Sequence, residues 1–267
     1  MSGPGGARPR NWTKLPASVV KSAGRVLQIL EYFDDVQRDA TVVEVAQALG
    51  YPQSSASTLL RSLVTLGYLH YSTTGRSYRP TTRVRLLGSW INPPLFEEAK
   101  ILRLVSDLNA ATGETIVLAV RNGLHAQYIH VAQATTSLRL HLTPGTLRPL
   151  AASGAGWVLL STVPAGEVAK LVRRINAEAP SGTPKVDVAE LQARLDDIRA
   201  RGHAFSNSTV TPGGAILAML LPSELSESPL VIGIGGASER MVPKEAELAA
   251  AMRQTIARHL AEMGRGD

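Results

Sequence analysis

Cysteine is absent from the 267 residues of the chain. This absence excludes disulfide bonds, thiolate metal sites and cysteine nucleophiles. The chain also lacks any apolar run that approaches the roughly 20 residues of a membrane span, and its first residues contain no apolar core of the signal-peptide type. We therefore expect a cytoplasmic protein without a membrane partner.

Acidic residues are missing from one long stretch. No Asp or Glu occurs between Glu44 and Glu97, whereas that window contains Arg61, Arg76, Arg79, Arg83 and Arg85. Residues 1–90 contain eleven Lys and Arg against five Asp and Glu, and residues 91–267 contain seventeen of each. The whole net charge of +6 therefore lies at one end. Because each neutralised phosphate releases condensed counterions, such a stretch favours binding to a nucleic acid backbone.

Signatures of catalysis and metal binding are lacking as well. The six histidines are scattered, and no pair has the spacing of a metal site supported by Asp or Glu. The segment 151–155, AASGA, lacks the leading Gly of a nucleophile elbow. The glycines at 213–214 and 233–236 have neither a following Gly-Lys-Ser/Thr nor G-x-G-x-x-G spacing. We predict no enzyme activity, no cofactor and no metal.

The segment 41–66, TVVEVAQALGYPQSSASTLLRSLVTL, predicts two short helices joined by a tight turn. Thr41 precedes the first apolar repeat and can cap the first helix with its hydroxyl. Gly50 lies where a helix ends in a left-handed residue, and a proline two residues later cannot continue that helix. Ser54 and Ser55 can cap the second helix. The pattern is that of a helix-turn-helix.

The second of these helices has two different faces. Its apolar stripe is Ala56, Leu59, Leu60, Leu63 and Leu66, and its other face carries short hydrogen-bonding side chains around a single Arg. Such a face suits a helix that lies in a major groove about 12 Å wide. An ordinary helical hairpin with a polar outer face is the alternative, and the acid-free surroundings favour DNA. We predict DNA contacts from Lys21, Arg25, Thr41, Gln53, Ser54, Ser55, Ser57, Thr58, Arg61 and Arg76.

The remaining N-terminal pattern completes a winged helix-turn-helix. Residues 19–33 repeat apolar side chains at helical spacing and predict a supporting helix. Residues 68–72 and 77–79 predict two strands around a Thr74-Gly75 turn, which would form the wing with Arg76 near its tip. A plain hairpin is the alternative. We predict four parts: a disordered basic arm (1–18), a winged helix-turn-helix domain (19–80), a linker helix (81–94) that ends at consecutive prolines, and a second domain (95–267).

The second domain alternates helical and strand patterns. Helices are predicted at 95–112, 153–160, 167–176, 188–201 and 243–263. Strands are predicted at 115–121, 126–134, 137–142, 213–221 and 230–237, and Asn122-Gly123 between two of them is a strong hairpin signal. We expect a mixed α/β domain with an antiparallel sheet covered by helices, and hence an α+β fold for the chain.

The order of these parts resembles the IclR-type family of bacterial transcriptional regulators. The segments that carry the resemblance are GYPQSSASTLLRSLVTLGYL (50–69), YRPTTRVRLLG (78–88), TGETIVLAVRNG (112–123), PGTLRPLAASGAG (144–156), LDDIRARGHAF (195–205), PGGAILAML (212–220) and GGASER (235–240). The resemblance implies a DNA-binding regulator, more often a repressor than an activator, that binds a palindromic operator as a homodimer or a dimer of dimers. It also implies a small-molecule effector in the second domain. The family usually has Arg at the position of Thr58 and often Lys at the position of Gln53. The operator bases that this chain contacts can therefore differ from those of other family members.

The effector residues that the resemblance implies depart from the family in a consistent direction. In family members that bind small oxo-acids, a Gly-Ala backbone pair, an Asp, a Cys and two Ser hold the carboxylate. Here Gly154 and Ala155 keep the backbone pair, whereas the other positions are Ser206, Ile216, Gly233 and Gly235. Loss of side chains at the two glycines enlarges a pocket, and Ile makes it more apolar.

We therefore expect an effector larger or more apolar than pyruvate, for example an aromatic catabolite, with Tyr128 or Trp157 near it. Two alternatives stay open: an enzyme with an appended DNA-binding module, and a constitutive DNA binder with a vestigial pocket. An enzyme predicts converging titratable groups in the pocket, where the sequence offers glycines and aliphatic residues.

Overall fold

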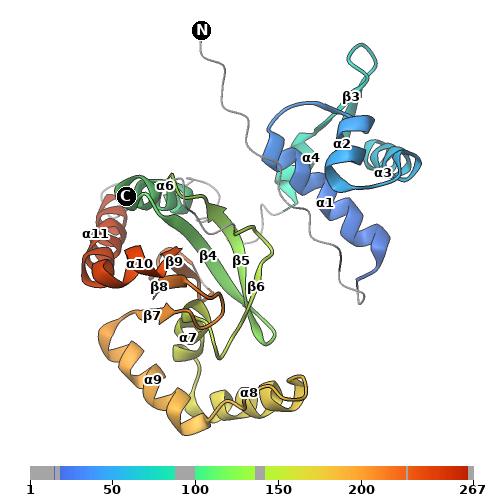
Figure 1. Cartoon of the computed structure of the whole chain (residues 1–267). Helices are drawn as coiled ribbons and strands as arrows, with labels where there is room; N and C mark the ends of the chain where they lie inside the picture. The colour runs from blue at the N-terminus through green and yellow to red at the C-terminus, as the bar shows by residue number, and fades with distance from the viewer. Residues whose placement is uncertain (1–14, 16–18, 88–99, 136–141, 227, 264–267) are drawn as a thin grey trace. The chain divides into compact units, whose positions relative to one another are not determined.

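The computed structural model describes residues 15, 19–87, 100–135, 142–226 and 228–263 (Figure 1). The chain divides into two compact units, residues 1–91 and 92–267, each with its own apolar core. Several predicted features lie outside the described residues. These are the basic arm apart from Leu15, the linker helix beyond residue 87, the beginning of the helix at 95–112, and the strand at 137–142 apart from Leu142.

The first unit is the predicted winged helix-turn-helix. Its elements are α1 (Lys21–Val36), β1 (Ala40–Thr41), α2 (Val42–Leu49), α3 (Gln53–Thr65), β2 (Leu69–Ser72), β3 (Ser77–Pro80) and α4 (Thr82–Leu86). The strands form an antiparallel sheet in the order β1-β3-β2. The core of this unit joins helices α1, α2 and α3 to the sheet. At its centre are Ile29, Val45, Leu60 and Leu69, all of them buried.

Helix α2 begins and ends as the sequence predicts. The hydroxyl of Thr41 accepts a hydrogen bond from the Glu44 backbone N–H, and the Glu44 carboxylate accepts one from the Thr41 backbone N–H at 2.8 Å. This reciprocal pair is a capping box. The hydrogen bond from the Thr41 backbone lowers the pKa of Glu44, with help from the Thr41 hydroxyl and Arg38. At the other end Gly50 has a left-handed φ of 66°.

The predicted cap of α3 is wrong. Helix α3 begins at Gln53, and the residue at its N-cap is Pro52, which has no side-chain hydrogen bond to offer. Ser54 and Ser55 lie within the first turn, too far along to cap it. The predicted hairpin turn at Thr74-Gly75 is present within the turn at residues 73–76, and its left-handed residue is Arg76, with φ 48°.

The second unit contains a six-stranded antiparallel sheet in the order β6-β5-β4-β9-β8-β7. Its strands are β4 (Thr115–Asn122), β5 (His125–Ala132), β6 (Leu147–Pro149), β7 (Ala204–Asn207), β8 (Gly214–Leu220) and β9 (Val231–Ala237). Its helices are α6 (Lys100–Thr112), α7 (Gly154–Ser161), α8 (Ala165–Glu178), α9 (Val188–Arg201), α10 (Ser238–Met241), the 3-10 turn η1 (Val242–Lys244) and α11 (Glu245–Met263). The expected antiparallel sheet with helical cover is confirmed.

Helices cover both faces of this sheet. Because successive side chains of a strand point to opposite faces, β4 contributes to two cores. Ile116 and Leu118 pack with α6 and α11, whereas Val117 and Ala119 pack with α7 and α9. None of the helices in the described ranges combines the length and apolar character needed to span a membrane.

Two close contacts fix the helices to the sheet. Gly156 in α7 faces the Leu150 backbone so closely that a Cβ there would overlap the Leu150 carbonyl oxygen and lie 2.7 Å from its carbon. On the other face, Glu114 is buried and accepts two hydrogen bonds from the Arg240 guanidinium, each at 2.8 Å. A Cβ at Gly236 would lie 2.7 Å from the Glu114 carboxylate. Both glycines are therefore required by close packing.

Candidate functional sites

The outer face of α3 is an exposed polar stripe. Ser54, Thr58, Arg61 and Thr65 are all exposed and follow one another at intervals of three and four residues, which places them on one side of the helix. Gln53 is exposed at the beginning of the same helix. The opposite side, Ala56, Leu60 and Leu63, is buried. The helix therefore presents a continuous polar surface that makes no contribution to the core.

Three hydroxyl groups along α3 turn back onto the helix. Thr58 Oγ1 donates to the Ser54 carbonyl at 3.0 Å, Ser62 Oγ to the Thr58 carbonyl at 2.9 Å, and Thr65 Oγ1 to the Arg61 carbonyl at 3.1 Å. Each bond spans four residues, as Ser and Thr within helices often do.

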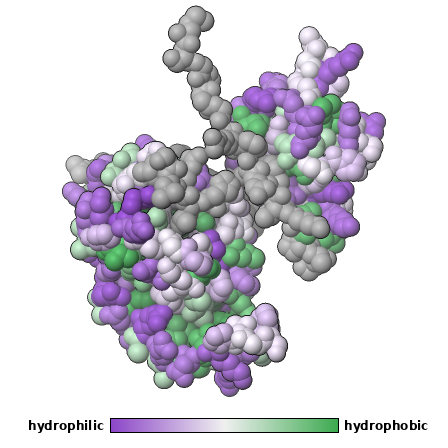
Figure 2. Space-filling view, in the orientation of Figure 1, coloured by the Kyte–Doolittle hydropathy of each residue, from purple (hydrophilic) through white to green (hydrophobic). Residues whose placement is uncertain are grey.

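Other predicted DNA contacts have different surroundings. Lys21 and Arg76 are exposed, whereas Ser55 and Ser57 are half-buried. The Arg25 guanidinium lies 4.8 Å from the centroid of the Tyr51 ring. The Thr41 hydroxyl is engaged in the capping box. Hydrophilic residues dominate the visible surface around α3 and the wing hairpin (Figure 2).

Helix α3 and the wing share one electrostatic environment. Burial raises the pKa of Tyr78 on β3, as does the neighbouring Tyr71, while the positive charge of Arg61 acts in the opposite direction. The two tyrosine rings lie 4.8 Å apart between centroids. The charge of Arg61 on α3 therefore acts on the wing strand β3.

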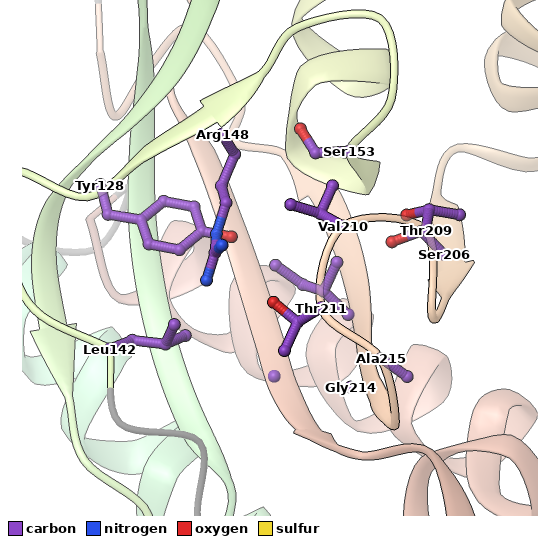
Figure 3. Close-up of a pocket in the computed structure, with 12 residues that line it drawn as sticks. Tyr128, Leu142, Arg148, Ser153, Ser206, Thr209, Val210, Thr211, Gly214 and Ala215 are labelled. Atoms are coloured by element: carbon purple, nitrogen blue, oxygen red, sulfur yellow. The ribbon is translucent and has the colours of Figure 1, made fainter. Parts of the chain in front are cut away.

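A cavity of about 40 Å³ lies in the second unit, on the side of the sheet covered by α7. Strands β5, β6, β7, β8 and β9, the beginning of α7 and the segment between β7 and β8 all contribute to its wall. The lining residues are Tyr128, Leu142, Arg148, Ser153, Ser206, Thr209, Val210, Thr211, Gly214, Ala215, Ile216 and Gly235. Figure 3 shows Tyr128 and Arg148 side by side, with their polar ends in the space that Thr211 also faces.

Arg148 and Tyr128 are the main polar groups of this cavity. The Arg148 guanidinium carbon lies 5.9 Å from the centroid of the Tyr128 ring. Burial raises the pKa of the Tyr128 hydroxyl, and the charge and hydrogen bonding of Arg148 oppose that rise. A neutral hydroxyl donor therefore lies beside a permanent positive charge. An anion with two or more oxygen atoms matches this pair, because guanidinium groups bind carboxylates in a bidentate manner.

The hydroxyls of Ser153, at the beginning of α7, and Ser206, on β7, have different roles at the cavity. Ser153 donates to the Pro149 carbonyl at 2.9 Å and accepts from the Gly156 N–H at 3.2 Å, so it acts as the helix cap. Ser206, which replaces the expected Asp, is only 5% exposed and lines the cavity. A Cβ at Gly154 would lie 3.0 Å from Ser206 Oγ and 3.0 Å from Ile216 Cγ2. The structure thus brings Gly154, Ser206 and Ile216 together.

Gly233 and Gly235 on β9 differ in the amount of free space beside their Cα atoms. A Cβ at Gly235 would lie 3.8 Å or more from its nearest neighbours, so this glycine adds room to the cavity that it lines. A Cβ at Gly233 would lie only 2.8 Å from Ile216 Cδ1 and 3.1 Å from Val117 Cγ2. The space expected above Gly233 is therefore filled by Ile216, because the Ile side chain lies across the neighbouring strand.

Trp157 and Ala155 do not line the cavity. The Trp157 indole N–H donates to the Ala151 carbonyl at 2.7 Å, and the Arg194 guanidinium lies 4.3 Å from its ring centroid. Trp157 therefore joins α7 to α9. Ala155 is fully buried in the same core.

Arg148 is the cavity residue that the sequence-based prediction missed. It is the only Lys, Arg, Asp or Glu between Arg139 and Glu167. That isolation in an otherwise uncharged segment is the signal that could have identified it. Thr209, Val210 and Thr211 were also missed, because they lie in a connecting segment without periodicity.

Both units match known families and proteins. The family described as "Bacterial transcriptional regulator IclR C-terminal" matches residues 94–261, and the "IclR helix-turn-helix domain" matches residues 22–73. HTH-type transcriptional regulator BhcR of Paracoccus denitrificans (strain Pd 1222) is 28% identical over 224 residues, which cover 83% of this chain and 79% of that protein. Transcriptional repressor IclR of Escherichia coli (strain K12) is 26% identical over 250 residues, which cover 88% of this chain and 87% of that protein.

Solved structures show the same architecture. The effector domain of a transcriptional regulator IclR from Acinetobacter sp. ADP1 matches with a TM-score of 0.58 and 28% identity, over 63% of this chain and 98% of that one. An IclR transcriptional regulator from Alicyclobacillus acidocaldarius shares the fold, with a TM-score of 0.58 and 22% identity. The match covers 91% of this chain and 98% of that one. Both relatives named above regulate transcription and neither is named as an enzyme. The chain therefore belongs to the IclR family of bacterial transcriptional regulators, which bind DNA through a helix-turn-helix domain.

Proposed function

We propose that the protein is a transcriptional repressor that releases its operator when an organic anion occupies the cavity beside Arg148. The observation that carries the proposal is the pairing of Arg148 with the Tyr128 hydroxyl at a cavity wall, in a chain whose other unit exposes a polar recognition helix. The Escherichia coli relative is named as a repressor, which supports this direction of regulation.

The effector we propose has a carboxylate and an apolar body, and is larger or more apolar than pyruvate. Arg148 and Tyr128 would hold the carboxylate, while Leu142, Val210 and Ile216 offer apolar contacts to the rest. The cavity of about 40 Å³ admits only part of an aromatic acid. The segment Thr209–Thr211 would therefore move outward, which is a route by which an occupant can change the protein's shape.

A palindromic operator would be bound in the cytoplasm by a homodimer or by a dimer of dimers, with one copy of the chain on each half-site. Two recognition helices must match half-sites about one helical turn or a multiple apart. An effector that favours a different arrangement of the copies would shift the population away from the DNA-binding form.

The test is a thermal-shift measurement with a matched pair of probes and a matched pair of proteins. Benzoate and benzamide have similar size and shape but differ in charge. Benzoate should raise the melting temperature of the wild-type protein, because a ligand in excess stabilises by RT ln(1 + [L]/Kd), and benzamide should not. Arg148→Gln should lose the response to benzoate and still bind operator DNA, which shows that the variant is folded.

The second step measures operator release by the same compounds. Release of the wild-type protein by benzoate or another aromatic acid, and retention of Arg148→Gln, would support the proposal. If a panel of aliphatic and aromatic acids stabilised neither protein, the protein would be a constitutive DNA binder. If an acid stabilised both proteins equally, Arg148 would not hold the carboxylate.

A further inference from the structure

The side chain of Thr58 has little left to offer as a hydrogen-bond donor. Its hydroxyl donates to the Ser54 carbonyl at 3.0 Å, although the residue is exposed on the outer face of α3. A hydroxyl has one proton and two acceptor lone pairs. With the proton engaged along the helix, Thr58 presents a γ-methyl group and oxygen lone pairs to any partner.

The same bond recurs further along α3, so it is a property of this helix rather than of one residue. Ser62 and Thr65 also donate to the carbonyls four residues before them, at 2.9 and 3.1 Å. Of the stripe formed by Ser54, Thr58, Arg61 and Thr65, the strong free donor is the Arg61 guanidinium. Within the described residues, no ion pair involves Arg61.

The base pairs present different donors, acceptors and methyl groups in the major groove, so they differ in which contacts they can make with such a side chain. Guanine presents two acceptors in the major groove, N7 and O6, which need a donor. Thymine presents a C5-methyl group, and its paired adenine presents an N6 amino donor. The lone pairs can accept a hydrogen bond from adenine N6 or equally from cytosine N4, so the contact that distinguishes A·T from G·C is the one between the Thr58 methyl group and the thymine C5-methyl group.

We propose that Thr58 selects an A·T pair in the operator through its γ-methyl group, which contacts the thymine methyl, beside the site that Arg61 contacts. This inference rests on the proposal that α3 enters the major groove. Thr58 lies in the N-terminal half of α3, the part of a recognition helix that contacts base edges. Arg61 follows three residues later, about 4.5 Å along the helix axis, so its contact would lie about one base pair away.

The experiment compares two conservative variants of Thr58 by selection of binding sites from random double-stranded DNA. Thr58→Val keeps a methyl group in place and removes the hydroxyl, whereas Thr58→Ser keeps the hydroxyl and removes the methyl. The wild-type protein and Thr58→Val should prefer A·T over G·C at one position by about fourfold or more, which is the value of burying one methyl group. Thr58→Ser should bring that preference to within about twofold at this position and leave the other positions unchanged.

Thr65 provides the matched control. It makes the same backbone bond as Thr58 but lies at the last residue of α3, away from the end that contacts bases. Thr65→Ser removes the same methyl group from the same kind of hydrogen-bonded side chain. Its selected motif should be identical to that of the wild-type protein.

The outcomes separate this inference from the proposed function. If Thr58→Ser leaves the wild-type motif unaltered, the role of the methyl group is overturned while operator binding stands. This holds whether or not Thr58→Val changes the motif. If the wild-type protein enriches no motif, sequence-specific operator binding itself fails, and the inference fails with it.

Discussion

The two functional regions of this protein are assembled in different ways. The exposed polar stripe of α3 comes from one continuous helix, with the wing hairpin following directly in the sequence. The cavity instead gathers residues from Tyr128 to Gly235, contributed by five strands, the N-terminus of a helix and two connecting segments. The first region therefore depends on local helix geometry, whereas the second depends on the packing of the whole second unit.

This difference predicts different responses to substitution. Outer residues of α3 are exposed, so their replacement should change DNA binding with little effect on stability. Residues that join α7 and the sheet are buried, so their replacement should affect stability and the cavity together.

The largest effect should come from Gly156 in α7. A Cβ there would overlap the Leu150 backbone, which is not a flexible side chain and cannot move aside. Gly156→Ala should therefore lower the free energy of unfolding by about 3 kcal/mol or more, as overpacking against rigid groups does, and abolish the response to aromatic acids. Chemical denaturation followed by circular dichroism measures this loss.

Gly166 in α8 is the matched control, because a Cβ there would meet nothing within 4 Å. Gly166→Ala lies in a helix and should raise stability by about 0.5–1 kcal/mol. Equal effects of the two substitutions would contradict a cavity held by the close contact of α7 with Leu150.

The next largest effect should come from the partly buried ion pair of Glu114 and Arg240 on the opposite face. Glu114→Ala removes a carboxylate that is 7% exposed and leaves Arg240 without its two hydrogen bonds. Because the Arg240 side chain is 31% exposed and water can solvate its charge, breaking this pair should lower the free energy of unfolding by about 2 kcal/mol, less than for a fully buried pair. Glu178→Ala, which breaks the exposed pair of Arg174 and Glu178, should change stability by less than about 0.5 kcal/mol. Urea denaturation of both variants gives the comparison.

A smaller effect, and one on binding alone, is expected at Arg61. Arg61→Ala should weaken operator binding by about 1–3 kcal/mol if the guanidinium contacts guanine, or reduce the salt dependence of binding by about one phosphate if it contacts the backbone. Fluorescence anisotropy at several salt concentrations distinguishes the two. Arg253→Ala, at an exposed position of α11, should leave binding unchanged. An unaltered affinity and salt slope for Arg61→Ala would remove this residue from the interface.

The smallest effect should come from the capping box of α2. Glu44 has a lowered pKa in the folded protein, so its stabilisation is complete above its ordinary value of 4.5 and is lost as the pH falls through the lower, folded value. Glu44→Ala should lower the free energy of unfolding by about 0.5–1 kcal/mol at neutral pH. The difference from the wild-type protein should shrink below pH 4.5. Glu44→Gln keeps a capping side chain without a titrating group, so its stability should not follow this trend.

The sequence predicts the first region well because its signals are local. The Thr41 cap, the left-handed Gly50 and the apolar stripe of α3 each depend on residues within one or two helical turns. The errors here are small. The sequence analysis assigned the α3 cap to Ser54 and Ser55, and it did not identify β1, which is only two residues long. It also placed Leu66 in the buried stripe of α3, whereas Leu66 follows the last turn of the helix and is 57% exposed.

The second region shows what local signals cannot predict. Strands β6 and β7 were not predicted, since three or four residues on the edges of a sheet carry too little periodicity. They are the strands that place Arg148 and Ser206 at the cavity. Their positions depend on pairing with distant partners, such as Leu147 with Gln127 and Ser206 with Ile216.

Ile216 extends between Gly154 and Gly233, so one side chain occupies room that two glycines leave free. It lies in the wall of the same cavity as Arg148. In the proposed function, Ile216 would therefore set much of the size of the bound acid, separately from the charge of Arg148 that would attract it. A shorter side chain at position 216 would widen the range of detectable acids, which makes this position the natural starting point for turning the protein into a biosensor.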